Sequence, residues 1–290
     1  MPYMKETCVA GKTIEIRKYY NFHVPPPGEH RGIREKPTPE RVKKANRRKA
    51  ETDLRRLMNA NFTDRDYSLT LTYRKGKKPK SITDLRKDAA GYAKRLTREA
   101  KRLGIPFRFI YCVGAGKHRR HIHILVSAFP DMGIVSDAWE KGHVGMTRLY
   151  SNGNYGELAA YYIRNAEDTR EEEKDQGLKP RRRYNTSHNL IKPKVTKEKI
   201  HSKEFRKTPR PMKGYQIIKD TIVSGISDLT GMPYLSYIQI KDKDYAGDQP
   251  IHSYRSEGKH KRKGARRIRT GTGKDGTAPG PQDGHSGRKP

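Results

Sequence analysis

The chain has 290 residues and carries 64 Lys and Arg against 32 Asp and Glu, a formal net charge of +32. Such a charge repels itself unless a polyanion offsets it, so nucleic acid is the expected partner. Two cysteines, Cys8 and Cys112, exclude a disulfide framework and a four-cysteine zinc site, which is typical of a reducing, cytoplasmic compartment. The sequence has no apolar run of the roughly 18 to 20 residues that a membrane span needs, and its start lacks the apolar core of a signal peptide. We therefore expect a cytoplasmic protein with no membrane partner.

The first quarter of the chain predicts a strand, a basic helix and a second strand. Residues 12–20 alternate as a strand does, until the Pro-Pro-Pro-Gly segment at 25–28 ends the pattern. Residues 39–60 are rich in helix formers and in Lys and Arg, which predicts a basic helix with a face that is either solvated or follows phosphates. In residues 67–73, Tyr-Ser-Leu-Thr-Leu-Thr-Tyr, one strand face packs and the other is a row of hydroxyls.

A basic loop and a helix follow this strand. Residues 74–80 form the loop, whose cations are predicted to contact nucleic-acid phosphates. The residues concerned are Arg74, Lys75, Lys77 and Lys78. Ser81 or Thr83 then caps a helix in which small and apolar residues recur at helical spacing as far as Leu103, and Gly104 ends it. The order predicts a strand-loop-helix unit.

Two apolar strands come next, and the second carries a pair of histidines. Residues 107–113 and 118–126 are the strands of a predicted hairpin, with the turn at 114–117. Because successive side chains of a strand point to opposite faces, His121 and His123 share one face, while the isoleucines beside them face the core. Two imidazoles about 6 to 7 Å apart along a strand can hold one divalent ion if a third ligand comes from elsewhere. The alternative is a solvent-facing pair with no ligand role.

A second helix with a polar face is predicted from Asn154 onward. Asn154 is the expected N-cap, with Glu157 three residues on, close to a capping box. On the helical wheel Glu157, Tyr161 and Arg164 lie on one side. Tyr162 lies on another side, with the apolar residues of the helix.

The remaining segments are less regular. Residues 134–139 predict a short helix, and residues 213–241 resume weak strand patterning. Residues 181–190 are either a solvated loop or a second phosphate-binding cluster. Its cations are Arg181, Arg182 and Arg183. Residues 255–290 hold eleven Lys or Arg, three acids and eight Gly, which predicts a disordered basic tail. No P-loop pattern occurs, so no nucleotide-hydrolysing helicase domain is expected.

Five segments, in this order, resemble the motifs of the HUH-type rolling-circle replication initiators, the replication-associated endonucleases of Gram-positive plasmids and integrated elements. The segments are 68–73, His121-Ile-His123, 139–142, 158–164 and 183–193. Together they cover roughly residues 10 to 195, and their order makes the resemblance more specific than any one motif. The resemblance implies an α+β fold with a central antiparallel five-stranded sheet, RRM-like or ferredoxin-like, and helices packed on it.

From these patterns we predict four parts along the chain. The first holds the N-terminal strand and the basic helix, and the second is the HUH endonuclease core. A C-terminal extension and the disordered basic tail follow. The predicted boundaries are 1–60, 61–195, 196–254 and 255–290.

The resemblance also implies a chemistry. A divalent ion, Mn²⁺ or Mg²⁺, held by His121 and His123 polarises the scissile phosphate, and Tyr161 attacks phosphorus. The products are a 5′-phosphotyrosine and a free 3′-OH that primes rolling-circle replication. Arg164 stands where the family pattern has lysine, so it keeps the cation but not the ability to lend a proton. The implied partners are origin DNA, single-stranded at the nick, and a host helicase and DNA polymerase.

Several alternatives stay open at this stage. The candidates for the third metal ligand are His118, Glu140, His143 and Glu157. Tyr162 could alternate with Tyr161 as nucleophile, although neighbouring residues differ by about 100° on a helix. The chain could also be a non-enzymatic DNA- or RNA-binding protein in which Tyr161 stacks on bases. A relaxase or transposase with the same chemistry is a further alternative.

Overall fold

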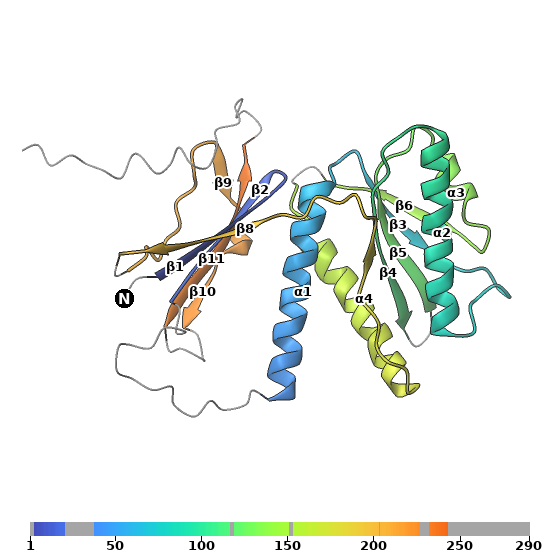
Figure 1. Ribbon diagram of the computed structural model, residues 1–290, viewed down its shortest axis with the longest axis horizontal. Helices are drawn as coiled ribbons and strands as arrows, with labels where there is room; N and C mark the ends of the chain where they lie inside the picture. The colour runs from blue at the N-terminus through green and yellow to red at the C-terminus, as the bar shows by residue number, and fades with distance from the viewer. Residues whose placement is uncertain are drawn as a thin grey trace, which may run out of the picture. The chain divides into compact units, whose positions relative to one another are not determined.

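The computed structural model describes six stretches of the chain. They are residues 3–20, 38–116, 119–150, 153–202, 204–226 and 232–242. The chain divides into two units, Met1–Tyr245 and Ala246–Pro290, and all the described residues lie in the first. Within these stretches the chain forms two antiparallel sheets and four α-helices (Figure 1). The predicted α+β class is confirmed.

The histidine strand lies at the centre of a five-stranded sheet. The order of its strands is β6-β3-β5-β4-β7, and every neighbouring pair is antiparallel. The strands are β3 (Tyr67–Leu71), β4 (Phe109–Gly116), β5 (Arg119–Val126), β6 (Val144–Arg148) and β7 (Asn185–Thr186). The sheet therefore has the strand number and direction that we predicted, while its assignment to the HUH type stays a prediction.

Helix α2 (Ile82–Arg102) covers one face of this sheet (Figure 1). Ser81 caps it, since its hydroxyl accepts a hydrogen bond from the Asp84 N–H at 3.0 Å. The buried residues of α2, which include Leu85, Tyr92 and Leu96, pack with Ile122 and Ile124 of β5, so the isoleucine face is core as predicted. Burial of each large apolar side chain stabilises the fold by about 1.5 to 3 kcal/mol. The short helix α3 (Gly133–Asp137) packs with the same cluster.

Helices α1 (Pro39–Asn61) and α4 (Gly156–Asp175) lie on the opposite face. The predicted basic helix is thus present, and its buried residues pack with those of α4. Our expectation that Asn154 is the N-cap of α4 was wrong, because the N-cap is Tyr155 and no side chain caps the helix. Tyr155 is completely buried and its N–H donates to Asn59 Oδ1 at 2.9 Å. Packing of this ring, rather than a polar cap, determines where α4 begins.

The second sheet joins the two ends of the described chain. Its strands are β1 (Tyr3–Ala10), β2 (Thr13–Tyr19), β8 (Val195–Ile200), β9 (Tyr215–Ile217), β10 (Val223–Ile226) and β11 (Pro233–Lys241). They run in the order β10-β11-β2-β1-β8, with β9 also pairing β11. The predicted strands around 12–20 and in 213–241 are confirmed, whereas β1 and β8 were not predicted. The segments 25–28 and 255–290 lie outside the described residues.

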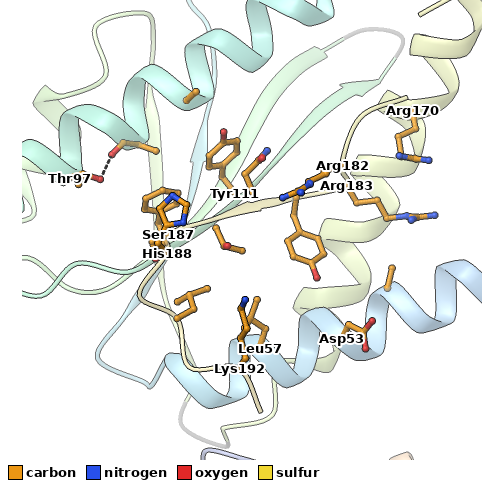
Figure 2. Close-up of a pocket in the computed structure, with 18 of the residues that line it drawn as sticks. Asp53, Leu57, Thr97, Tyr111, Arg170, Arg182, Arg183, Ser187, His188 and Lys192 are labelled. Carbon is orange, nitrogen blue, oxygen red and sulfur yellow. Dashed lines mark hydrogen bonds between the residues drawn. The ribbon is translucent and has the colours of Figure 1, made fainter. Parts of the chain in front are cut away.

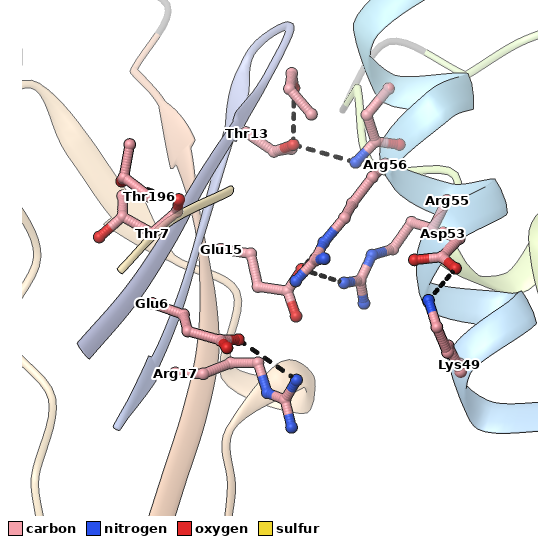
Figure 3. Close-up of polar contacts among 12 residues, drawn as sticks. Glu6, Thr7, Thr13, Glu15, Arg17, Lys49, Asp53, Arg55, Arg56 and Thr196 are labelled. Atoms are coloured by element: carbon pink, nitrogen blue, oxygen red, sulfur yellow. Dashed lines mark hydrogen bonds and ion pairs between the residues drawn. The ribbon is translucent and has the colours of Figure 1, made fainter. Parts of the chain in front are cut away.

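Buried polar contacts hold α1 against β2 (Figure 3). The Glu15 carboxylate accepts from Arg55 at 2.7 Å and from Arg56 at 2.6 Å, and its side chain is 9% exposed. Burial alone would raise the pKa of Glu15, but the two guanidinium groups outweigh it and hold that pKa below its usual value. Asn59 Nδ2 donates to Thr13 Oγ1 at 3.0 Å. No helix in the described stretches has the length and apolar character of a membrane span.

Candidate active site

Strand β5 presents two histidines toward helix α4. The ring centroids of His121 and His123 lie 4.6 Å apart, and both rings are on the sheet face opposite α2. Gly114 pairs with His121 across the hairpin. A Cβ atom at position 114 would lie 2.3 Å from His121 Nε2, so only glycine leaves room for this imidazole.

His123 is a buried, neutral imidazole. It is 3% exposed, and burial, followed by repulsion from His121, lowers the pKa of His123 to about 3. Its Nδ1 lies 3.2 Å from Thr70 Oγ1 on β3, whereas its buried Nε2 has no hydrogen-bond partner among the described residues. When the Nδ1–H donates to Thr70, Nε2 keeps a free lone pair, which is the state that a metal-ligating histidine needs.

His121 lies between two acceptor oxygens. Its Nδ1 is 3.0 Å from the Arg119 carbonyl oxygen, and its Nε2 is 3.0 Å from Asn165 Oδ1 on α4. Asn165 Nδ2 donates to the Tyr161 carbonyl oxygen at 2.8 Å, which turns the amide oxygen toward the imidazole. A neutral imidazole has one N–H, so it can donate to only one of these oxygens. If Nδ1–H donates to Arg119, then Nε2 and Oδ1 are two lone-pair donors that a cation would satisfy together.

The two tyrosines of α4 occupy different environments. Tyr161 is 43% exposed, and its ring centroid lies 4.8 Å from that of His123. Tyr162 is fully buried in the core between α4 and the sheet, and its hydroxyl lies 3.2 Å from Ser68 Oγ. Burial raises the pKa of the Tyr162 hydroxyl far above its ordinary value. An exposed phenol beside the histidines is available to a phosphate, whereas a buried and hydrogen-bonded phenol is not.

The other residues predicted around the metal do not gather there. Arg164 is exposed on α4 and makes no hydrogen bond or ion pair with any described residue. Across the described stretches, no three His, Cys, Asp or Glu side chains form a group that could hold a metal ion. Glu140, His143 and Glu157 are therefore not combined with the histidine pair. His118 lies outside the described residues.

The two predicted phosphate-binding clusters lie on different parts of the scaffold. Arg120 Nη1 donates to the Pro79 carbonyl oxygen at 2.6 Å, which ties the loop of residues 74–80 to the strand that carries the histidines. Its four predicted cations are exposed. The cluster of residues 181–183 leads into β7, at the sheet edge, where Arg183 pairs with Glu167. Only the first cluster is attached to the histidine strand.

Sequence reasoning missed three residues that build this site. Asn165 is four residues after Tyr161 and thus on the same helix face, so the spacing could have revealed it. Gly114 required the strand register, and Thr70 required the pairing of β3 with β5, in which it lies opposite His123. All three are uncharged, and a search for acids and histidines passes over them.

A net charge of +32 is typical of a protein that binds nucleic acid, and paired imidazoles beside an exposed phenol are groups that can hold a metal ion and attack a phosphate. The family model of replication-associated protein ORF2/G2P matches residues 66–168. This segment, which runs from just before β3 into α4 and contains both histidines and Tyr161, is therefore similar to replication-associated proteins. The predicted resemblance to replication initiators is confirmed at this level. No curated protein and no solved structure matches the chain.

Proposed function

We propose that the protein initiates rolling-circle replication by nicking origin DNA in a metal-assisted transesterification with Tyr161 as nucleophile. The observation that carries this proposal is the position of the exposed Tyr161 ring, 4.8 Å from a buried, neutral His123 whose Nε2 has no described partner. The match of residues 66–168, which include both histidines and Tyr161, to the replication-associated protein ORF2/G2P family model supports the proposal. A binding protein that used Tyr161 only for stacking would have no need for the two histidines behind it.

The residues present fit a divalent ion. His121 Nε2, His123 Nε2 and Asn165 Oδ1 would hold it, and the 3.0 Å between His121 Nε2 and Asn165 Oδ1 is about the separation of two neighbouring ligands with bonds near 2.1 Å. Asn165 thus takes the place for which the sequence offered only histidines and acids. A bound Mn²⁺ or Mg²⁺ would polarise the scissile phosphate. Two imidazoles also bind Zn²⁺ or Ni²⁺ more tightly by the usual affinity order, so the metal in use depends on availability.

Tyr161 and Arg164 carry out the remaining steps, which are nucleophilic attack and phosphate binding. The Tyr161 oxygen loses its proton and bonds to phosphorus, while the bond from phosphorus to the 3′ oxygen breaks and that oxygen takes up a proton. The products are a 5′-phosphotyrosine and a free 3′-OH. Arg164, one turn further along α4, supplies a fixed cation for a phosphate in the strand. The phosphotyrosine keeps the energy of the phosphodiester, so rejoining needs no ATP, and polymerase and helicase come from the host.

A covalent adduct tests this proposal. The protein is incubated with labelled single-stranded DNA carrying candidate origin sequences and Mn²⁺, and label that survives SDS and boiling is measured, with EDTA as the control. His121→Ala and His123→Ala should abolish the adduct and leave DNA affinity nearly intact, because affinity rests on many phosphate contacts and the chemistry on one ion. An adduct retained in the double variant would refute the metal assignment. No adduct on any origin would favour a non-enzymatic binding protein.

A further inference from the structure

A groove of about 970 Å³ lies along the β7 edge of the five-stranded sheet, between α1 and α2 (Figure 2). Its lining comes from residues of these two helices, from Arg170 of α4, from β4 and from residues 182–192, which include β7. The lining contains neither histidine nor Tyr161, and strand β4 lies between β7 and the histidine strand β5. The groove is therefore separate from the active site.

The groove is strongly basic. Its cations are Lys49, Lys94, Arg170, Arg182, Arg183 and Lys192, and its one lining acid is Asp53. Asp53 is neutralised by Lys49 at 2.6 Å, and Arg183 pairs with Glu167. Lys94, Arg182 and Lys192 have no ion pair with any described residue. An excess of free cations in one concave surface attracts a polyanion.

Aromatic rings lie among these cations. Phe109 and Tyr111 lie in the lining as a stacked pair, with ring centroids 6.0 Å apart and an interplanar angle of 20°. Tyr184 contributes a third ring. Phe109 and Tyr184 are only partly buried, so both keep some ring surface open. Unpaired bases stack on such rings, whereas the bases of a duplex already stack on each other.

We propose that this groove is a second binding site, for single-stranded DNA, and that it holds a segment of strand outside the nick. Cations and rings in one groove are the combination by which proteins bind single strands without reading their sequence. The identity of the polymer as DNA rests on the proposed function. The assignment of the groove as a single-strand binding site rests only on its lining residues.

The matched experiment removes two free cations from the groove and two from elsewhere. The groove variant carries Lys94→Ala and Lys192→Ala. The control variant carries Lys101→Ala and Lys207→Ala, at two lysines that are exposed and absent from the groove lining. Binding of a fluorescent dT 12-mer to the full chain is measured by anisotropy at several NaCl concentrations. Loss of two phosphate contacts should make the plot of log binding constant against log salt concentration less steep by about 1.4, since each single-strand contact contributes about 0.7 to the steepness. The control should keep the wild-type slope.

Three readouts decide the result. Equal slopes for the groove variant and the wild type would overturn the proposal. An equal loss of affinity for a 12-base-pair duplex would also overturn it, because the site would then be a general phosphate surface. The amount of Tyr161 adduct, measured with saturating origin oligonucleotide and Mn²⁺, should be the same in the groove variant and the wild type. An absent adduct in both would refute the proposed function and leave the salt slopes as the test of the groove.

Discussion

Replacing Gly114 with alanine should disable the active site while the protein stays folded. The new Cβ would lie 2.3 Å from His121 Nε2, 2.6 Å from Cε1 and 3.0 Å from Cδ2. Ordinary carbon contacts begin near 3.5 Å, so the imidazole must withdraw by about 1 Å. That movement takes Nε2 away from Asn165 Oδ1, which is 3.0 Å away in the native arrangement.

The loss of activity should be much larger than the loss of stability. A misplacement of about 1 Å at a reacting centre lowers the rate by about 10²-fold, equivalent to about 2.7 kcal/mol. The alanine also removes conformational freedom from the unfolded chain, which stabilises by about 0.4 to 1 kcal/mol and offsets part of the clash. The free energy of unfolding should therefore change by only about 1 kcal/mol, in the range of a mild core substitution.

The assay combines Mn²⁺ affinity by titration calorimetry, the rate of adduct formation and thermal unfolding. Gly91→Ala is the matched control, because its Cβ would meet only Arg95 Nη1, at 3.7 Å, in the interior of α2. The control should keep the adduct rate and raise the melting temperature slightly, since alanine is favoured over glycine in a helix by about 1 kcal/mol. A Gly114→Ala protein with wild-type Mn²⁺ affinity and rate would refute the geometry proposed for His121.

Three further predictions follow from separate parts of the protein. Tyr162→Phe should keep the adduct and cost about 1 kcal/mol of stability in urea unfolding, because only the hydrogen bond to Ser68 is lost; loss of the adduct would contradict its packing role. Glu15→Gln should destabilise by about 3 kcal/mol, since it leaves Arg55 and Arg56 without their carboxylate. Because the pKa of Glu15 is lowered in the folded state, the stability that this carboxylate contributes is full above pH 4.5 and is lost as the pH falls through the folded pKa. The Glu15→Gln protein should therefore lose less stability on acidification than the wild type. Parallel profiles of stability against pH for the two proteins would refute this. Deleting residues 255–290 should weaken DNA binding and flatten its salt dependence without affecting the adduct rate, and an unchanged salt slope would show that this segment does not contact DNA.

The sequence predicted the elements whose signals are local. The alternation at 67–73 and in the histidine strand, and the capped periodicity after Ser81, each depend on neighbouring residues, and β3, β5 and α2 follow them. The separation of Tyr161 from Tyr162 also needed only the helical period. These elements and the two tyrosine environments could be predicted from local sequence alone.

The second sheet could not be predicted in the same way. Strand β8 pairs with β1, as in Cys8 with Val195, across more than half of the chain. Half of its sequence, Val-Thr-Lys-Glu-Lys-Ile, is charged because it is an exposed edge strand, so it lacks an apolar alternation. Pairing over such a distance leaves no local pattern. The start of α4 was missed for a related reason, because the burial of Tyr155 overrides the polar cap that Asn154 suggested.

The central claim is that Tyr161 forms the covalent bond to DNA. Peptide mapping of the trapped adduct, after digestion of the SDS-resistant complex formed with labelled origin DNA and Mn²⁺, tests it most directly, with Tyr161→Phe and Tyr162→Phe run in parallel. The label should lie on Tyr161 alone, and Tyr161→Phe should form no adduct while its melting temperature is unchanged, because this side chain is exposed. Label on Tyr162 alone, or on both tyrosines, would contradict the account.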